Sequence, residues 1–219
     1  WKNAEGEIKL DTQGNQVMIE QVEAPQWMSQ YAVDPSGTAD GPLQFYLSAG
    51  IHKITVESVT EPMLLKKISL LPADSFAVTQ YDDAAAEYKD SKDNKNEKIV
   101  IEGENADIKS DMMFYPVSDK TSPSVSPYSY SKIVYNSIGG SQWSNAGQWL
   151  EWKFKVEKSG TYSLSAHFKQ STKEYRASVR TVYIDGKIPF AEAENWMFPY
   201  SSVWQTEAFS DKNGDPYLF

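Results

Sequence analysis

Cysteine is absent from the 219 residues, and histidine occurs only twice, at His52 and His167. Without cysteine the chain can form no disulfide, no thiolate nucleophile and no cysteine-ligated zinc site. Neither histidine lies in a recognisable nucleophile motif or at metal-binding spacing from a second ligand, so the sequence outlines no triad and no zinc site. A glycine-rich phosphate-binding loop is missing as well. These absences favour a protein that is not an enzyme.

Long apolar runs and an excess of positive charge are also missing. No stretch of about 18 apolar residues occurs, so we expect no membrane insertion by this segment. The net charge of −9 opposes binding to nucleic acid, because phosphate recognition requires a basic surface. No signal peptide is visible after Trp1, and the abrupt start indicates an excerpt of a larger chain with other domains.

Alternation of apolar and polar residues is the most informative feature that the chain does contain. Residues 147–156 and 161–168 flank a turn that ends at Gly160. The apolar members share one face of each segment: Leu150, Trp152, Phe154 and Val156 in the first, and Tyr162, Leu164, Ala166 and Phe168 in the second. This period predicts antiparallel strands with one buried face. Together with 13% aromatic residues, it predicts an all-β fold, a β-sandwich or jelly roll.

Two parts of the chain share a pattern that indicates two related copies of one module. Residues 27–47 and 204–219 each contain a tryptophan, a polar stretch, a glycine-containing turn and a strand that follows a proline. The first copy continues into two further strand candidates, at 51–57 and 63–71. The second copy ends before any equivalent of these two strands.

Both copies therefore look partial. We predict residues 1–74 to be the C-terminal part of a first β-sandwich and residues 99–219 to be a second one that lacks its closing strands. Because an open sheet edge is a hazard, either further chain or the two partial copies must complete the sandwiches.

Residues 75–98 read as a linker that is partly helical and partly charged. Residues 82–89 contain helix formers with acidic residues first and lysine last, which suits the helix dipole. Residues 90–98 are charged and lack apolar periodicity, as is typical of a connector. The proline-rich stretch 115–140 cannot be a regular helix, and a long loop of this kind often carries binding residues.

Several motifs, in their order along the chain, resemble carbohydrate-binding modules of the family 6, 35 and 36 group. They lie at residues 101–106, 138–143, 147–156, 160–164 and 182–187, with a further one at 47–54 in the first copy. The likeness extends to the paired modules ahead of the solute-binding domain in large Gram-positive transport lipoproteins. It implies a galactose-binding-like jelly roll, a polysaccharide or oligosaccharide ligand, and an extracellular or cell-surface location.

The same resemblance implies a structural Ca²⁺ held by Glu102 and Glu104. Alternate residues on a strand would place both carboxylates on one face, where they could supply hard oxygen ligands. The family's aspartate on the closing strand has its counterpart near residues 66 and 67, which are lysines here. The alternative is that both glutamates are ordinary surface or hydrogen-bonded carboxylates.

A sugar site needs an aromatic platform and planar polar groups. Trp143 lies in a glycine-rich turn with Asn136, Gln142 and Asn145 around it in sequence, which makes it the first candidate platform. The other interpretation is a loop tryptophan that folds onto the core, since tryptophan is usually well buried.

A second group of candidates follows the strand at residues 161–168. Gln170, Tyr175 and Arg176 lie in that loop, and Arg176 could donate to sugar hydroxyls or pair with Glu174. The apolar residues 196–200 form either a binding lip or, as we favour, a contact between domains.

Three functions remain open on the sequence alone. The first is a non-catalytic carbohydrate-binding module, and the second is a structural or docking β-sandwich without a ligand of its own. The third is a fragment of a glycoside hydrolase, which requires two facing carboxylates. Glu151, Glu192 and Glu194 are available for that role, but no motif selects a pair of them.

Overall fold

The computed structural model describes residues 1–34, 36, 38, 41–72, 78–89, 91, 98–172, 174–201, 203, 205–208 and 210. The chain divides into two compact units, each described by itself: unit 1 comprises residues 1–26 and 79–219, and unit 2 comprises residues 27–78. This division differs from the predicted boundaries at residues 74 and 98. The physical reason is that the first 22 residues hydrogen-bond to residues 104–135.

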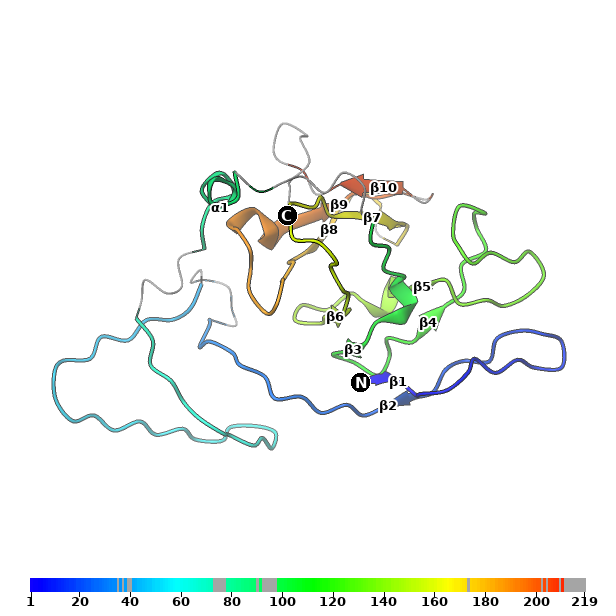
Figure 1. Ribbon diagram of the computed structural model, residues 1–219. Helices are drawn as coiled ribbons and strands as arrows, with labels where there is room; N and C mark the ends of the chain where they lie inside the picture. Colours follow the sequence, from blue (N-terminus) through cyan, green and yellow to red (C-terminus); the bar gives the residue numbers. More distant parts are fainter. Residues whose placement is uncertain are drawn as a thin grey trace. The chain divides into compact units, whose positions relative to one another are not determined.

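The described part of the chain is mainly β, which confirms the predicted fold class at that level, and its single α-helix is α1 (Tyr81–Glu87) (Figure 1). The strands are short: β1 (Lys2–Asn3), β2 (Gln21–Val22), β3 (Ile108–Lys109), β4 (Pro116–Val117), β5 (Ser137–Ile138), β6 (Leu150–Glu151), β7 (Ser165–Phe168), β8 (Ser178–Arg180), β9 (Trp196–Phe198) and β10 (Gln205–Ala208). Three 3₁₀ turns accompany them: η2 (Gly103–Asn105), η3 (Gly140–Gln142) and η4 (Ala191–Asn195). None of the described helices is both long enough and apolar enough to cross a bilayer.

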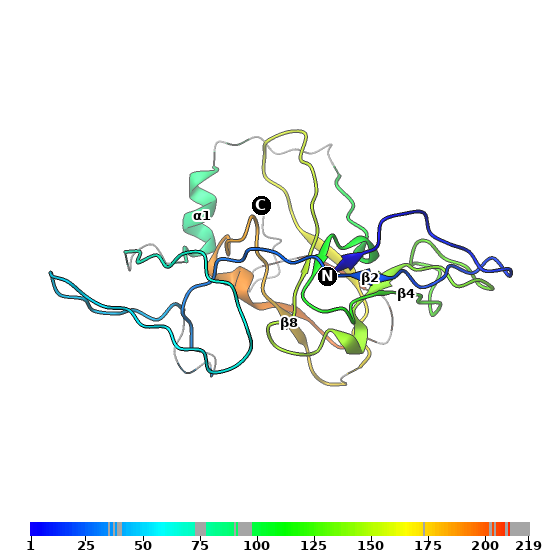
Figure 2. The same ribbon diagram turned by 90° about the horizontal axis from the view of Figure 1, so that it is seen from below.

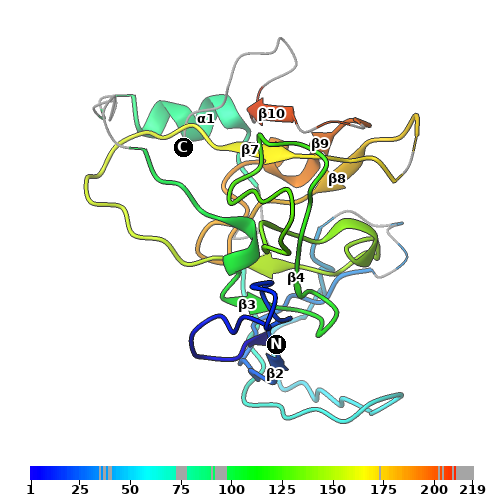
Figure 3. The same cartoon turned by 90° about the vertical axis from the view of Figure 1, so that its right-hand side faces the viewer.

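The described strands pair antiparallel in two-stranded sheets: β1 with β2, β3 with β6, β4 with β5, β7 with β10 and β8 with β9. Trp1 and Lys109 exchange both backbone hydrogen bonds at 2.8 Å, so the first residues of the chain also adjoin β3. Figure 3 shows β7, β8, β9 and β10 next to one another, and the rings of Phe168 and Phe198 meet edge to face at 5.0 Å between β7 and β9.

The segment 147–168 departs from the predicted hairpin. Its two strands do not pair with each other, because β6 pairs with β3 and β7 pairs with β10. The predicted alternation holds in the second arm, where the residues between Tyr162 and Phe168 alternate between half-buried and exposed. In the first arm Phe154 and Val156 are exposed. The Lys153 amide donates to the Asp107 carboxylate at 2.6 Å, which ties the chain after β6 to the β3 side.

An apolar core in unit 1 contains buried Phe190, Ala193 and Trp196. Helix α1 packs on this core through Tyr81 and Ala84. The Tyr81 amide donates to the Glu192 carboxylate at 3.0 Å, which places α1 beside η4 (Figure 2). The helix lies close to its predicted position at 82–89, but it belongs to the core of unit 1. The charged run after it lies mostly outside the described residues.

The apolar patch at residues 196–200 is divided by strand geometry. In β9 Trp196 is buried, Met197 is exposed and Phe198 packs on Trp196, with ring centroids 4.7 Å apart. The favoured interpretation of this patch as a contact between domains is therefore wrong for Trp196 and Phe198, which pack inside unit 1. Alternation along a strand explains the result, since neighbouring side chains point to opposite faces.

Unit 2 is extended. Its described residues contain one isolated bridge, between Val33 and Pro42, and the Leu43 amide donates to the Ala32 carbonyl at 2.7 Å. The Lys66 ammonium lies 5.9 Å from the Trp27 ring centroid. In the second copy of the predicted repeat, Trp204, residue 209 and residues 211–219 lie outside the described residues.

Candidate functional site

Trp143 directly follows the turn η3 and packs against the protein. Gly139 has a φ of 98°, a left-handed conformation that glycine adopts readily, and a Cβ there would lie 3.3 Å from Trp143 Cε3. The indole N–H donates to the Gln148 carbonyl at 3.2 Å. The Arg180 guanidinium lies 4.2 Å from the ring centroid, and the Phe114 ring approaches edge-on at 6.3 Å. One ring face is therefore covered within unit 1, and glycan stacking on Trp143 stays a prediction.

Arg180 at the end of β8 is a residue that sequence reasoning missed. Its Nη2 donates to the Trp143 carbonyl and its Nη1 to the Val179 carbonyl, both at 2.8 Å. Burial lowers the pKa of the Arg180 guanidinium, which still stays charged because arginine titrates so high. The two partners are separated by 37 residues and share no motif, so only the fold brings them together.

The turn that carries Asn145 is organised by Gln148. The Gln148 Oε1 accepts from the amides of Ser144 and Asn145 at 3.1 and 3.0 Å, and its Nε2 donates to Asp111 at 3.3 Å. Asn145 itself is exposed. Gln142 is half-buried, and its Oε1 is sealed from solvent without a hydrogen bond to the described residues. Sequence reasoning missed Gln148 as well, although its place at the end of a Gly-containing turn is a usable signal.

Asn136 holds the long loop together. It is 6% exposed, and its Nδ2 donates to the carbonyls of Asp119 and Pro127, both at 2.9 Å. Its Oδ1 accepts from the Asp119 amide at 2.8 Å. A salt bridge between Lys169 and Asp119 fixes the same loop to the end of β7. In this arrangement the amide of Asn136 orders residues 119–127, as expected of a buried polar side chain whose hydrogen bonds are satisfied.

The loop at residues 170–176 presents an exposed tyrosine and arginine on a fixed base. Gln170 is buried, its Nε2 donates to the Arg176 carbonyl at 2.6 Å, and its Oε1 accepts from the Thr172 amide at 3.1 Å. The Gln170 carbonyl accepts from the Ser201 amide at 2.7 Å, which connects the loop to the chain after β9. Tyr175 is 90% exposed and has a φ of 62°. Arg176 is exposed beside it.

The predicted sugar-site residues thus fall into two groups. Gln142, Trp143 and Asn145 share the turn after β5, whereas Gln170, Tyr175 and Arg176 share the loop before β8. Strand β8 connects the two groups. It begins two residues after Arg176, and its last residue, Arg180, places its guanidinium on the ring of Trp143. Asn136 belongs to neither group, because it is buried and hydrogen-bonds to Asp119 and Pro127 of the long loop.

Glu102 and Glu104 occupy different environments. Residues 103–105 form the 3₁₀ turn η2, so the predicted strand face that both carboxylates would share is not formed. Glu102 is exposed, whereas Glu104 is buried and its Oε2 has no hydrogen bond in the described structure. Burial raises the pKa of Glu104, and the nearby Glu102 raises it further. Glu104 suits one Ca²⁺ ligand, but the described residues bring no three of His, Cys, Asp or Glu together. The calcium site stays a prediction.

Lys109 is buried like Glu104, but sequence reasoning did not single it out. It is 1% exposed, and its Nζ donates to Asn3 Oδ1 at 2.6 Å and to Gln21 Oε1. Gln21 Nε2 also donates to Asn3 Oδ1 at 3.0 Å. Burial lowers the pKa of Lys109 to about 8. This network fastens β1 and β2 to β3.

The carboxylates that a hydrolase would need have different surroundings. Glu192 accepts from the backbone amide of Tyr81, while Glu151 and Glu194 are exposed. Among the predicted sugar-site residues, Asn145, Tyr175 and Arg176 are the exposed ones. Comparisons of the chain with protein-family models, with curated proteins and with solved structures gave no match.

Proposed function

We propose that the chain is a non-catalytic carbohydrate-binding module of an extracellular or cell-surface protein that processes polysaccharide or takes up sugar. The observation that carries the proposal is the exposed ring of Tyr175. The side chain of Gln170 hydrogen-bonds to the backbone of Thr172 and Arg176 on either side of Tyr175 and so orders the loop. In this proposal Tyr175 supplies the stacking platform, and Arg176 donates hydrogen bonds to sugar hydroxyls.

The chemistry of the loop suits a neutral glycan. A pyranose ring presents a flat C–H face that packs on an aromatic ring, and its hydroxyls accept from a planar guanidinium with five N–H donors. Tyr175 adopts a left-handed backbone conformation that only a minority of non-glycine residues adopt. A backbone held in one conformation loses less conformational freedom when a ligand binds, which favours affinity.

The proposal includes a galactose-binding-like jelly roll with two related modules in the chain. Antiparallel pairing throughout the described strands supports it, as does the alternating burial before and within β7. So does the Asp-Gly turn at residues 185 and 186. Both residues have positive φ, and Ile184 and Lys187 exchange backbone hydrogen bonds around them. The order of the family-like motifs adds to this support.

A structural or docking module is the second candidate, and the exposed apolar residues of unit 2 favour it. Large apolar side chains between residues 43 and 71 stand in solvent, which is unusual for a chain that acts alone. The two functions are compatible, since the loop at 170–176 belongs to unit 1.

The test is a titration against a broad panel of plant and microbial polysaccharides, followed by affinity electrophoresis. The proposal expects retardation by at least one neutral glycan and none by a nucleic acid. Failure to bind any glycan of the panel, with a folded protein by circular dichroism, would leave the docking function as the better account.

A further inference from the structure

Tyr200 ends the apolar patch at residues 196–200 and lies outside the core that the rest of the patch joins. Trp196 is buried and Phe198 packs on it, whereas Tyr200 is 38% exposed. A tyrosine has an apolar ring and a polar hydroxyl, so its exposed ring suits a partner with an apolar face and a polar rim. The place of Tyr200 in the fold decides whether it can contact the same ligand as Tyr175.

The register of β8 and β9 brings Tyr200 to the loop that carries Tyr175. Ser178 pairs with Phe198, so the same pairing continued by two residues would place Arg176 opposite Tyr200. Residues directly opposite on antiparallel strands share a face and have Cβ atoms about 4.5–5.5 Å apart. Both Arg176 and Tyr200 are exposed. Tyr200 therefore adjoins the binding loop, although the two are distant in sequence.

Gln170 gives independent evidence for this arrangement, because it hydrogen-bonds to both segments. Its Nε2 donates to the Arg176 carbonyl at 2.6 Å, and its backbone carbonyl accepts from the Ser201 amide at 2.7 Å. Gln170 and Ser201 are 9% and 5% exposed, so the junction lies beneath the surface. Tyr175 directly precedes Arg176, and Tyr200 directly precedes Ser201. One buried glutamine thus holds together the two backbones that carry the exposed rings.

The chemistry of these side chains specifies the form of the ligand. The rings of Tyr175 and Tyr200 come from different segments, so they offer two separate faces on which a sugar can pack. The guanidinium of Arg176 beside them has N–H donors for sugar hydroxyls. If one sugar packs on the first ring, its neighbour in the same chain can pack on the second. This second contact forms within a ligand that is already bound, so it adds affinity without a further loss of translational freedom.

We propose that Tyr200 forms a second sugar subsite beside Tyr175 and Arg176, so that the site takes a segment of linked sugars and not a single sugar. The inference rests on the proposed glycan binding by the loop at residues 170–176. It adds a residue from outside that loop to the site, and it makes affinity depend on the length of the glycan chain.

Titration with defined oligosaccharides tests the second subsite. The probes are the monosaccharide, disaccharide and tetrasaccharide of xylan, β-1,4-glucan, β-1,4-mannan and β-1,3-glucan. The wild type is expected to bind one tetrasaccharide about tenfold or more tightly than the corresponding monosaccharide, through the additional aromatic contact. Tyr200→Ala is expected to remove this gain and to leave the monosaccharide Kd unchanged. Tyr200→Phe is expected to keep the gain, because the ring is retained.

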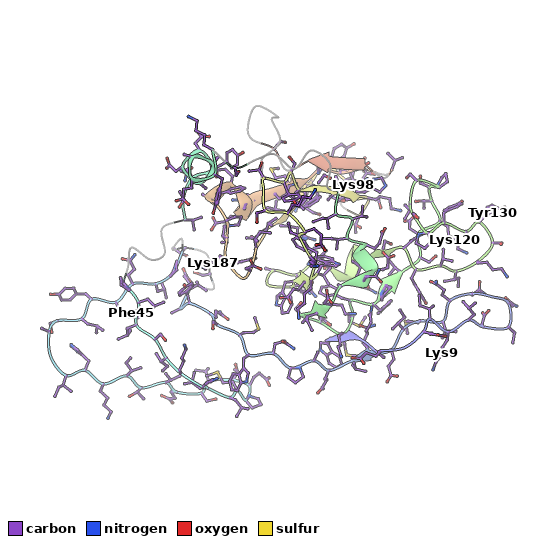
Figure 4. The ribbon with its side chains drawn as sticks, viewed as in Figure 1. Lys9, Phe45, Lys98, Lys120, Tyr130 and Lys187 are labelled. Carbon is purple, nitrogen blue, oxygen red and sulfur yellow. The ribbon has the colours of Figure 1, made fainter. Side chains whose placement is uncertain are left out.

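Tyr183→Ala is the matched control. Tyr183 is 60% exposed and lies beyond the other end of β8, before the turn that ends at Lys187, which Figure 4 labels. Its substitution is expected to leave every Kd unchanged. A tetrasaccharide Kd that Tyr200→Ala leaves within about twofold of the wild type overturns the second subsite, as does affinity that is independent of chain length. Absence of binding to every probe also overturns it, whereas the proposed function then stands if another glycan of the panel binds.

Cross-linking tests the arrangement without a ligand, because the chain has no cysteine of its own. A short bis-maleimide is expected to join Arg176→Cys to Tyr200→Cys within one chain, measured as the cross-linked mass of the monomer. The control pairs Arg176→Cys with Tyr183→Cys, which lies about 20 Å away at about 3.3 Å per extended residue. Equal yields of the internal cross-link from the two pairs would overturn the proposal, even where glycan binding by the wild type is intact.

Discussion

The guanidinium of Arg180 lies on the ring of Trp143, 4.2 Å from its centroid, and donates to the carbonyl of the same residue at 2.8 Å. One side chain thus holds both the ring and the backbone of the turn after η3. Because Arg180 ends β8, the contact ties that turn to the strand which follows the proposed glycan-binding loop. The contact between Arg180 and Trp143 therefore connects the turn that holds Gln142, Trp143 and Asn145 to the loop that holds Gln170, Tyr175 and Arg176.

A double-mutant cycle measures this tie. Arg180→Met and Trp143→Leu are each expected to lower the free energy of unfolding by about 1–3 kcal/mol. Each substitution removes the stacking contact and leaves a backbone carbonyl without its hydrogen bond, that of Trp143 in the first case and that of Gln148 in the second. The coupling energy between them is about 0.5–2 kcal/mol, read from urea denaturation of the four proteins. Arg176→Met serves as the matched control, since Arg176 is exposed, and its coupling with Trp143→Leu is expected to be near zero. Equal coupling in the two cycles would show that the stacked geometry contributes nothing.

Buried Lys109 predicts how stability changes with pH. Burial lowers its pKa to about 8, whereas an exposed lysine titrates near 10.4. Between these values the unfolded chain binds more protons than the folded one, so the free energy of unfolding rises with pH through this window. We expect a gain of about 1–3 kcal/mol between about pH 7.5 and about pH 9.5 that Lys109→Met does not show. Parallel pH profiles of wild type and variant, measured by urea denaturation, would contradict the burial of this ammonium.

Asn136 is predicted to matter for stability and not for ligand contact. Asn136→Ala leaves two carbonyls and one amide of the long loop without their partner, so we expect a loss of about 2–4 kcal/mol. Asn145→Ala is the exposed control and is expected to change stability by less than about 0.5 kcal/mol. Thermal unfolding separates the two variants, and similar midpoints would mean that the Asn136 network is dispensable.

Tyr175 is predicted to trade stability for function. A non-glycine residue with positive φ stores about 1–2 kcal/mol of backbone strain, which glycine relieves. The greater freedom of glycine in the unfolded chain opposes this gain. Because the two effects partly cancel, Tyr175→Gly is expected to leave the free energy of unfolding unchanged or to raise it by up to about 1 kcal/mol. Glycan binding should nevertheless be lost. A marked drop in the unfolding midpoint would show that the ring packs on the protein and is no free platform.

The sequence predicted the mainly β character well, because alternation and turn chemistry are local signals. The residues between Tyr162 and Phe168 alternate in burial as expected. Helix α1 lies within two residues of its predicted position. These features depend on neighbours along the chain, which a sequence displays directly.

Strand partners and buried polar contacts could not be predicted in the same way. The partner of β6 is β3 and not the adjacent segment, a choice that depends on contacts between residues more than 40 apart. Arg180 stacks on a tryptophan 37 residues away, and Lys109 bonds to Asn3 across 106 residues. Glu102 and Glu104 diverge because a 3₁₀ turn replaced the expected strand. Each outcome follows from tertiary packing that overrides local pattern.

Calorimetric titration of the tightest-binding glycan from the panel against three proteins tests the central claim most directly. Wild type and Tyr130→Ala are expected to bind with the same Kd, since Tyr130 is an equally exposed tyrosine on a different loop. Tyr175→Ala is expected to weaken binding by about 1.4–2.8 kcal/mol, or roughly tenfold to a hundredfold, through the loss of the stacking face. Unchanged affinity in Tyr175→Ala, with the fold intact, would contradict the assignment of the glycan site to the loop at residues 170–176.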